Sequence, residues 1–163
     1  MGGGQLNKVT HMKLKASSDY GIRAVFYLAM NDRVCSSKEI SEEMAIPRDY
    51  LIQLALRLRD AGILKARPGK NGGYELAKKP EKISVFDVID ALDAEDKQSR
   101  HPLSKKKSNA SVVDVVRYSQ KVMMKSYAVL FSKITVGDLV AFCSEGRDPK
   151  DMISCAFSKI TEG

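Results

Sequence analysis

The feature that most constrains this chain is a run of three helical patterns in which only a short turn separates the second from the third. Apolar residues recur at helical spacing over 14–30, 37–45 and 47–60. Ser36 or Ser37 is placed to cap the second of these helices, because serine favours the N-cap position. Only a few residues separate the second helix from the third, so the two are expected to form a helix-turn-helix.

A Gly-rich hairpin follows the third helix directly. Short apolar stretches at 63–66 and 74–76 flank the tip 67–73, whose Gly and Asn residues accept the positive φ angles of tight turns. Three helices followed by such a hairpin predict a winged helix-turn-helix. The fold class expected is therefore mostly α with a small β-hairpin, extended by a long C-terminal helix.

The second half of the chain changes character. Ser84 is placed to cap a helix over 85–93, and Thr135 to begin a short helix that runs to 143. The expected organisation is a leader or tag over 1–11, a winged helix-turn-helix domain over 12–93, an exposed polar linker over 94–111, dimerisation helices over 112–143 with a long helix at 112–131, and a tail over 144–163 with a weak helix at 150–160.

Composition narrows the class of protein. Lys and Arg number 27 against 20 Asp and Glu, giving a net charge of +7, which permits either nucleic acid or an anionic surface as a partner and does not choose between them. Three cysteines without a CxxC pair suit the reducing cytoplasm, and no apolar run is long enough for a membrane span. An enzyme is not expected, because no nucleophile–base pair or metal motif stands out and the Gly-rich 69–73 lacks the Lys-Ser/Thr of a phosphate-binding loop.

The third helix and the hairpin tip supply the candidate DNA contacts. Arg and Gln side chains pair with guanine and adenine edges in the major groove, and basic tips or helix N-termini bind phosphate. A residue such as Arg57 could equally lie on a solvated face, and Tyr50 could belong to the core. The predicted double-stranded DNA contacts are Ser36, Ser37, Lys38, Arg48, Asp49, Tyr50, Ile52, Gln53, Arg57, Arg67, Lys70 and Asn71.

Several segments together resemble a known family. They are LKASSDYGIRAVFYLA, SSKEISEEMAIPRDYLIQLALRLRDAGIL, GKNGGYELAKKPEKISVFDVIDAL and ITVGDLV. The chain is thereby similar to the Rrf-two family of bacterial transcription regulators, which includes the IscR, NsrR and CymR types. The resemblance implies a homodimer that binds a pseudo-palindromic operator, in the usual mode as a repressor.

The same resemblance assigns the long helix to the dimer interface. The alternative is a helix packed only within its own chain. The residues expected to meet the partner copy are Val112, Val116, Met123, Tyr127 and Leu130.

Departures from the family pattern are equally informative. Cluster-binding members carry three cysteines between the wing helix and the dimer helix, whereas residues 93–111 here contain none and offer only His101. We therefore expect no iron–sulfur cluster and no metal or other cofactor. Ile52 stands where the family often has Glu, and Pro68 where it usually has Arg. Both changes suggest an operator unlike those of the cluster-binding members.

The regulatory signal stays open at this stage. Cys35 precedes the second helix, whose dipole would lower the pKa of the thiol and make it a candidate redox switch. Its alternative role is that of a small packed residue. A small molecule near the dimer helix or a partner protein could also be the effector. The competing function is a dimeric protein-interaction adaptor with weakened DNA binding, which Ile52 and Pro68 favour.

Overall fold

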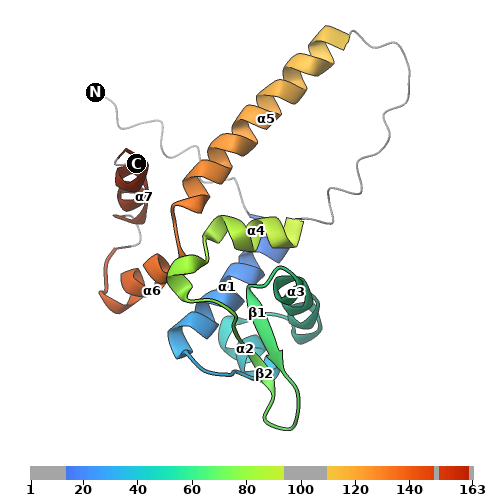
Figure 1. Ribbon diagram of the computed structural model, residues 1–163, viewed down its shortest axis with the longest axis vertical. Helices are drawn as coiled ribbons and strands as arrows, with labels where there is room; N and C mark the ends of the chain where they lie inside the picture. Colours follow the sequence, from blue (N-terminus) through green and yellow to red (C-terminus); the bar gives the residue numbers. More distant parts are fainter. Residues whose placement is uncertain (1–13, 94–109, 149–150, 162–163) are drawn as a thin grey trace.

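A computed structural model describes residues 14–93, 110–148 and 151–161 (Figure 1). The expected leader 1–11 lies outside these residues, as do residues 94–109 of the expected linker. The elements in chain order are α1 (Ala16–Asn31), α2 (Ser37–Met44), α3 (Arg48–Asp60), β1 (Leu64–Arg67), β2 (Gly73–Leu76), the 3-10 helix η2 (Pro80–Lys82), α4 (Val85–Asp93), α5 (Ala110–Ser132), α6 (Val136–Ser144) and α7 (Asp151–Thr161).

The hydrophobic core is centred on α1, which packs against α2, α3, α4 and α6. Leu28 of α1, Leu54 and Leu58 of α3 and Val88 of α4 are each at most 1% exposed. Full burial of such side chains stabilises the fold by about 1.5–3 kcal/mol each. The helical spacing in the sequence thus reflects one shared core, and the predicted helix-turn-helix is confirmed.

Local capping sets the helix starts. The Ser36 hydroxyl accepts a hydrogen bond from the Glu39 backbone N–H at 3.1 Å, so Ser36 rather than Ser37 is the N-cap of α2. Ser84 caps α4 in the same way, accepting from the Asp87 N–H at 3.0 Å. Ala45 ends α2 in the left-handed conformation with φ 52°. That conformation turns the chain sharply into α3.

The wing is the antiparallel pair β1–β2, in which Leu64 pairs with Leu76. Its second strand also pairs with the segment before α2. Cys35 N–H donates to the Tyr74 carbonyl at 2.9 Å, and Tyr74 N–H donates back at 2.8 Å. A Cβ on Gly73 would lie 2.1 Å from the Cys35 carbonyl oxygen, so only glycine permits this approach. The wing is therefore tied directly to the start of α2.

The C-terminal part of the chain returns to the winged domain. Val85 N–H donates to the Ile134 carbonyl at 2.8 Å, and Val136 N–H donates to the Ile83 carbonyl at 2.8 Å. Val136 is 2% exposed within the shared core. Although α6 was expected to belong with the dimerisation helices, it packs on α1 and η2. Its predicted start at Thr135 is confirmed by a full capping box with Asp138.

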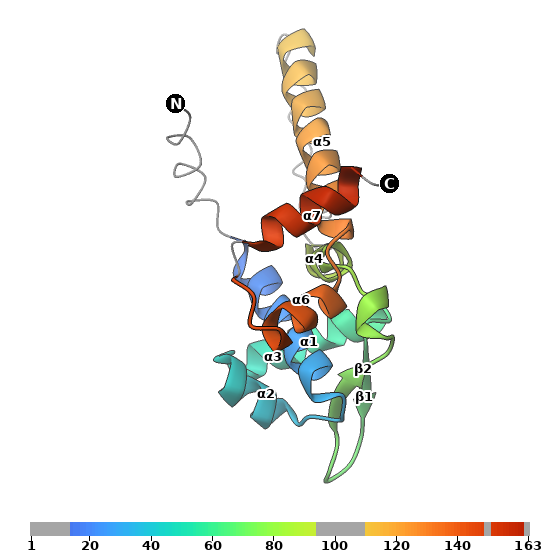
Figure 2. The same cartoon turned by 90° about the vertical axis from the view of Figure 1, so that its left-hand side faces the viewer.

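Helix α5 has different surroundings. It projects away from the winged domain, and the wing tip lies at the opposite end of the molecule (Figures 1 and 2). It begins at Ala110, slightly earlier than the expected residue 112. None of the helices in the described ranges is long and apolar enough to span a membrane. Large apolar side chains exposed on α5 are Val115, Tyr118, Val122, Met123, Met124 and Val129.

Candidate nucleic-acid interface

A groove of about 370 Å³ lies between the start of α2, the start of α3 and the wing. Its polar lining side chains are Ser36, Ser37, Arg48, Arg67, Lys70 and Tyr74, without a carboxylate. Arg48 Nε donates to the Ser37 hydroxyl at 3.3 Å, which joins the two helix starts. Five of the predicted DNA contacts therefore meet in one groove, and its hydroxyl and cationic groups suit a phosphate backbone.

The exposed face of α3 continues from this groove. Asp49, Ile52 and Gln53 are exposed, as predicted for residues that read bases. Ile52 is 43% exposed and Leu56, one turn further, is 49% exposed. Sequence reasoning missed Leu56, although its spacing of four residues from Ile52 already places it on the same helical face. The exposed face of α3 thus combines polar and apolar side chains.

The cations of the wing differ in whether they are already paired within the protein. Arg67 donates through Nε to the Glu75 carboxylate at 2.9 Å, and its Nη2 lies 2.8 Å from the same oxygen. This pair offsets the charge of Arg67. Lys70 and Asn71 are exposed at the tip, and Lys70 has no side-chain partner among the residues described. Within the described part of the chain, Lys70 is therefore an unpaired cation at the wing tip, where a nucleic acid can reach it.

Two of the predicted DNA contacts, Tyr50 and Arg57, interact with other residues of the protein. The Tyr50 ring packs edge-on against Tyr20, with centroids 5.8 Å apart. Arg57 is half-buried, and its Nη1 donates to the Leu92 carbonyl at 3.3 Å. A guanidinium at this position also compensates the negative end of the α4 dipole. Both placements favour the structural alternative for these residues, with Tyr50 and Arg57 orienting α3.

Lys38 makes only a loose ion pair, with Nζ 3.9 Å from Glu42 Oε1 on the solvent side of α2. It is not part of the groove lining. Because Lys38 directly follows Ser37 in the sequence, its charge adds to the positive field near the groove.

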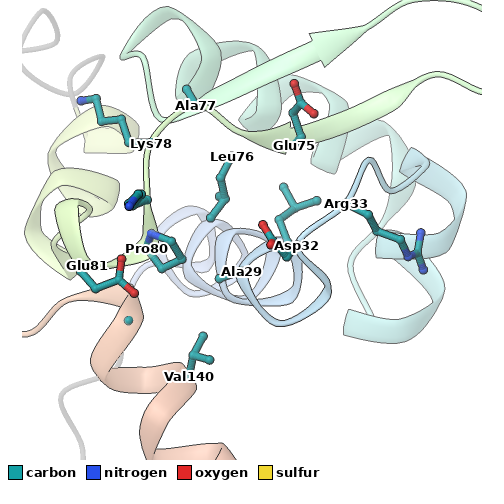
Figure 3. Close-up of a pocket in the computed structure, with 13 residues that line it drawn as sticks. Ala29, Asp32, Arg33, Glu75, Leu76, Ala77, Lys78, Pro80, Glu81 and Val140 are labelled. Carbon is teal, nitrogen blue, oxygen red and sulfur yellow. The ribbon is translucent and has the colours of Figure 1, made fainter.

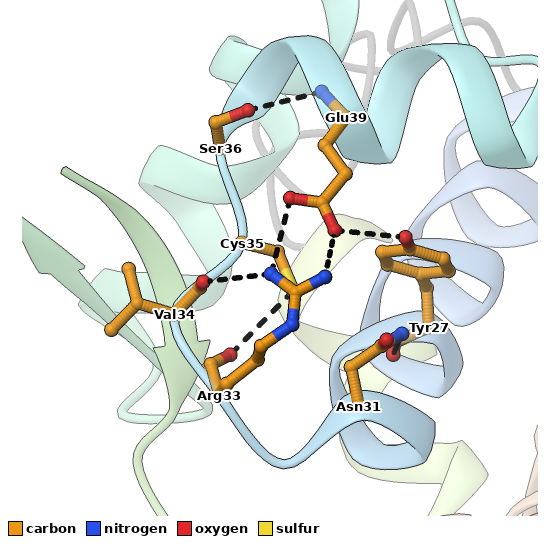
Figure 4. Close-up of polar contacts among 7 residues, drawn as sticks. All are labelled: Tyr27, Asn31, Arg33, Val34, Cys35, Ser36 and Glu39. Carbon is orange, nitrogen blue, oxygen red and sulfur yellow. Dashed lines mark hydrogen bonds and ion pairs between the residues drawn. The ribbon is translucent and has the colours of Figure 1, made fainter. Parts of the chain in front are cut away.

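A polar network fixes the start of α2 behind the groove (Figure 4). Glu39 accepts from the Tyr27 hydroxyl at 3.0 Å and from Arg33 Nη1 at 3.2 Å. The hydrogen bond from Arg33 holds the pKa of Glu39 below its usual value. Burial and the bond to Glu39 raise the pKa of Tyr27. The network went unnoticed in the sequence, although Glu39 three residues after the N-cap Ser36 is the spacing of a capping box.

Of the two roles expected for Cys35, the structure favours the small packed residue and contradicts the lowered thiol pKa of a redox switch. Its side chain is 0% exposed, and burial, reinforced by the nearby Glu39, raises the pKa of the thiol. The dipole of α2 was expected to lower that pKa, but desolvation of a thiolate outweighs it here. Cys35 therefore acts as a small packed residue beneath the wing.

The opposite side of the wing presents a contrasting surface. A cleft of about 740 Å³ lies between α1, β2, η2 and α6 (Figure 3). Its charged lining mixes both signs: Asp32, Arg33, Glu75, Lys78, Lys79 and Glu81. Carboxylates repel phosphate, so this side of the wing is the less favourable one for DNA.

The predicted dimer residues are only partly described. Met123 is 66% exposed, whereas Tyr127 and Leu130 are half-buried. The Tyr127 ring contacts Phe131, with centroids 4.3 Å apart. The side chains of Val112 and Val116 lie outside the described residues.

The fold and the groove define a winged helix-turn-helix regulator, and the comparisons with known proteins give its family. Residues 14–142 match the profile of Rrf2, described as an iron-dependent transcriptional regulator. The chain belongs to the Rrf2 (Rrf-two) family of transcriptional regulators.

Individual relatives agree with this membership. A HTH-type transcriptional regulator of Synechocystis, slr0846, is 40% identical over 84 residues, which make up 50% of this chain and 57% of that protein. Among solved structures, T. potens IscR is 29% identical with a TM-score of 0.65, covering 86% of this chain and 94% of that one. CymR of B. subtilis, the global cysteine regulator, is 26% identical with a TM-score of 0.57, covering 80% and 98%.

The family description refers to iron, which a cluster would bind through cysteine thiolates. The two thiols that the structure describes do not fit such a group. Cys35 is buried in the winged core and Cys143 is exposed on α6, while the side chain of Cys155 lies outside the described residues. Within the described ranges, no set of three or more His, Cys, Asp and Glu residues is grouped so that it could hold a metal ion.

Proposed function

We propose that the protein binds double-stranded DNA sequence-specifically as a homodimer, with each winged domain on one half of a pseudo-palindromic operator in the bacterial cytoplasm. The observation that carries this proposal is the carboxylate-free groove in which Ser36, Ser37, Arg48 and Lys70 meet. Family membership in a class of transcriptional regulators supports it. Repression follows where the operator overlaps a promoter.

Within each domain, the geometry supports different DNA contacts for α3, the start of α2 and the wing tip. The exposed face of α3, with Gln53 in its middle, enters the major groove, where an amide pairs with adenine. The hydroxyls of Ser36 and Ser37 hold backbone phosphate, and Lys70 and Asn71 at the wing tip reach the adjacent phosphate or minor groove. Arg48 bridges the two helix starts and contributes a guanidinium at their junction.

The homodimer is supported by the apolar surface of α5. Val115, Tyr118, Val122 and Val129 are spaced three, four and seven residues apart, which places them along one side of the helix. This is a different side from that of Met123, Tyr127 and Leu130, which the sequence assigned to the interface. Each is at least 46% exposed. A continuous apolar stripe of this kind is typical of a helix–helix interface, because burial against a second copy removes it from water.

The test is selection of binding sites from a random DNA pool with the full chain, followed by a salt titration of the selected site. An enriched inverted repeat that binds more weakly as salt rises is expected, because phosphate contacts release counterions. Arg48→Ala and Lys70→Ala should each weaken binding about tenfold and reduce the salt slope by about 1. Lys82→Ala removes an exposed cation of η2 and is the matched control. Selection of no site by a folded protein would contradict the proposal.

Repression is tested separately. A reporter promoter that carries the selected site should be silenced in cells that express the protein, and Arg48→Ala should restore its expression. Increased expression would show activation instead, with DNA binding intact.

One alternative function has an observation in its favour. Ile52 and Leu56 present an apolar pair on α3, which a protein-interaction adaptor would use to bind a partner. The two functions differ in salt dependence. A partner held by this apolar pair would resist salt and be lost in Ile52→Asp, whereas DNA would be released by salt.

A further inference from the structure

An apolar cavity of about 560 Å³ lies between α1, α6 and the start of α7, on a different side of the domain from the DNA groove. Its volume falls within the range of about 300–1,000 Å³ that is usual for small-molecule sites. The lining is mostly hydrophobic, with a few polar groups at its edge, which is the composition of a ligand pocket. Its apolar lining residues are Leu14, Ile22, Phe26, Leu139, Phe142 and Met152.

The charged groups at the cavity are two guanidiniums against one carboxylate: Arg23 and Arg147 against Asp19. Each guanidinium rests on an aromatic ring. Arg23 lies 5.5 Å from the Tyr20 centroid, and Arg147 lies 5.3 Å from that of Phe142. These stacks hold two cations beside an apolar space, where both guanidiniums can donate charge-assisted hydrogen bonds to the carboxylate of a ligand.

Existing ion pairs do not block these cations. Arg23 pairs with Asp19 at 2.7 Å and Arg147 with Glu145 at 2.5 Å, and all four side chains are at least 42% exposed. Exposed ion pairs contribute little, about 0–1 kcal/mol, so an incoming carboxylate can compete with them. A guanidinium has five N–H donors, so it can also donate hydrogen bonds to a second carboxylate without losing the first.

Arg23 also connects this cavity to the DNA-reading helices. Its Nη1 donates to the Met44 carbonyl at 3.4 Å, at the end of α2. The Tyr20 ring beneath it packs edge-on against Tyr50 in the first turn of α3. A ligand that draws Arg23 toward the cavity therefore acts on the helix-turn-helix through two direct contacts.

We propose that this cavity is an effector site for a small amphipathic carboxylate, whose apolar body lies between α1 and α6 and whose carboxylate binds Arg23 and Arg147. Binding shifts DNA affinity through Tyr20 and Tyr50. The regulatory half of this proposal rests on the proposed DNA-binding function, whereas ligand binding itself does not.

The first experiment measures binding in the absence of DNA. Octanoate is titrated into the full chain by calorimetry, with octanamide as its uncharged isostere. Saturable binding of one octanoate per chain is expected, with octanamide at least about tenfold weaker because it lacks the charge-assisted hydrogen bonds. The double variant Arg23→Gln/Arg147→Gln should bind both molecules equally, and Leu139→Trp should bind neither because the indole fills the cavity. Lys133→Gln, which removes an exposed cation just after α5, is the control.

The second experiment measures coupling with the selected DNA site. Octanoate should change the DNA affinity of the native chain by about fivefold or more, and DNA should change octanoate affinity by the same factor. Tyr20→Leu should retain octanoate binding but lose the coupling, and Tyr20→Phe should restore it because the ring remains.

The outcomes separate the two proposals. No saturable octanoate binding, or equal binding to the charge-removed variant, overturns the effector site while leaving DNA recognition intact. Octanoate binding without any change in DNA affinity overturns the regulatory route through Tyr20. Failure of DNA selection contradicts the proposed function but leaves the calorimetric result standing.

Discussion

The winged domain and helix α5 use the same kind of sequence pattern with opposite results. In the domain, apolar residues at helical spacing are buried, as with Leu54 at 1% exposure. On α5, Val122 at comparable spacing is 46% exposed. Periodicity thus predicts which face of a helix is apolar, but it does not predict which other part of the protein packs against that face. The domain covers its helices within one chain, whereas the apolar side of α5 is the surface that the proposed homodimer would cover.

The largest expected effect is in the core. Leu54→Ala should lower the free energy of unfolding by about 2–5 kcal/mol, because a fully buried leucine leaves a cavity. Val122→Ala should change the unfolding of the winged domain far less. Urea denaturation of the two variants checks this contrast, and equal losses would show that α5 is covered within its own chain.

Charges on α5 should have the next largest effect. Val122→Glu/Val129→Glu should weaken self-association about 100-fold, because burying two carboxylates between apolar helices is unfavourable. The unfolding of the winged domain should stay unchanged. Sedimentation equilibrium measures the association, and Lys121→Glu, a charge at an already polar position on α5, is the control. A dimer that survives the double change would place the interface elsewhere.

A smaller effect is expected for Arg57. Arg57→Met should cost about 1 kcal/mol of stability, because it removes the hydrogen bond to the Leu92 carbonyl. The salt slope of DNA binding should match that of the native chain, in contrast to Arg48→Ala. Urea unfolding and a salt titration provide the two measurements. A reduced slope would return Arg57 to the DNA contacts.

The smallest effect concerns pH. Because Arg33 lowers the pKa of Glu39 in the folded state, this carboxylate stabilises the fold above its unfolded pKa of about 4.3, and that contribution is lost as pH falls through the lower folded pKa. Glu39→Gln should therefore lose less stability than the native chain between about pH 5 and pH 3. Urea unfolding across that interval checks it, and parallel curves would argue against the network.

Much of the fold could be predicted because its signals are local. Ser84 and Thr135 mark helix starts through hydrogen bonds three residues away. The glycines of the wing are likewise a local signal, because they permit the backbone conformations of a tight turn. The packing of α6 against α1 could not be predicted in this way. Val136 is apolar in the sequence, but that does not show which element buries it.

The candidate site was predicted unevenly for the same reason. The sequence identified Arg48 and Lys70, which the structure brings into one groove. It also identified Arg57 as a DNA contact and Cys35 as a candidate reactive thiol, because their side chains suit those roles. The surroundings that the fold gives to these two side chains favour structural roles instead. The Leu92 carbonyl engages Arg57, and burial under the wing raises the pKa of Cys35.

By itself, the sequence determined the helices, the hairpin and the apolar face of each helix, because these depend on residues within a turn or two of one another. Only the tertiary structure decided which charged side chains are engaged internally, as Arg57 and Arg67 are, and which are available at the groove, as Lys70 is. The physical reason is that a side chain's hydrogen-bond partners and its desolvation are supplied by segments distant in sequence. Local patterns specify the surfaces, and packing decides their contacts.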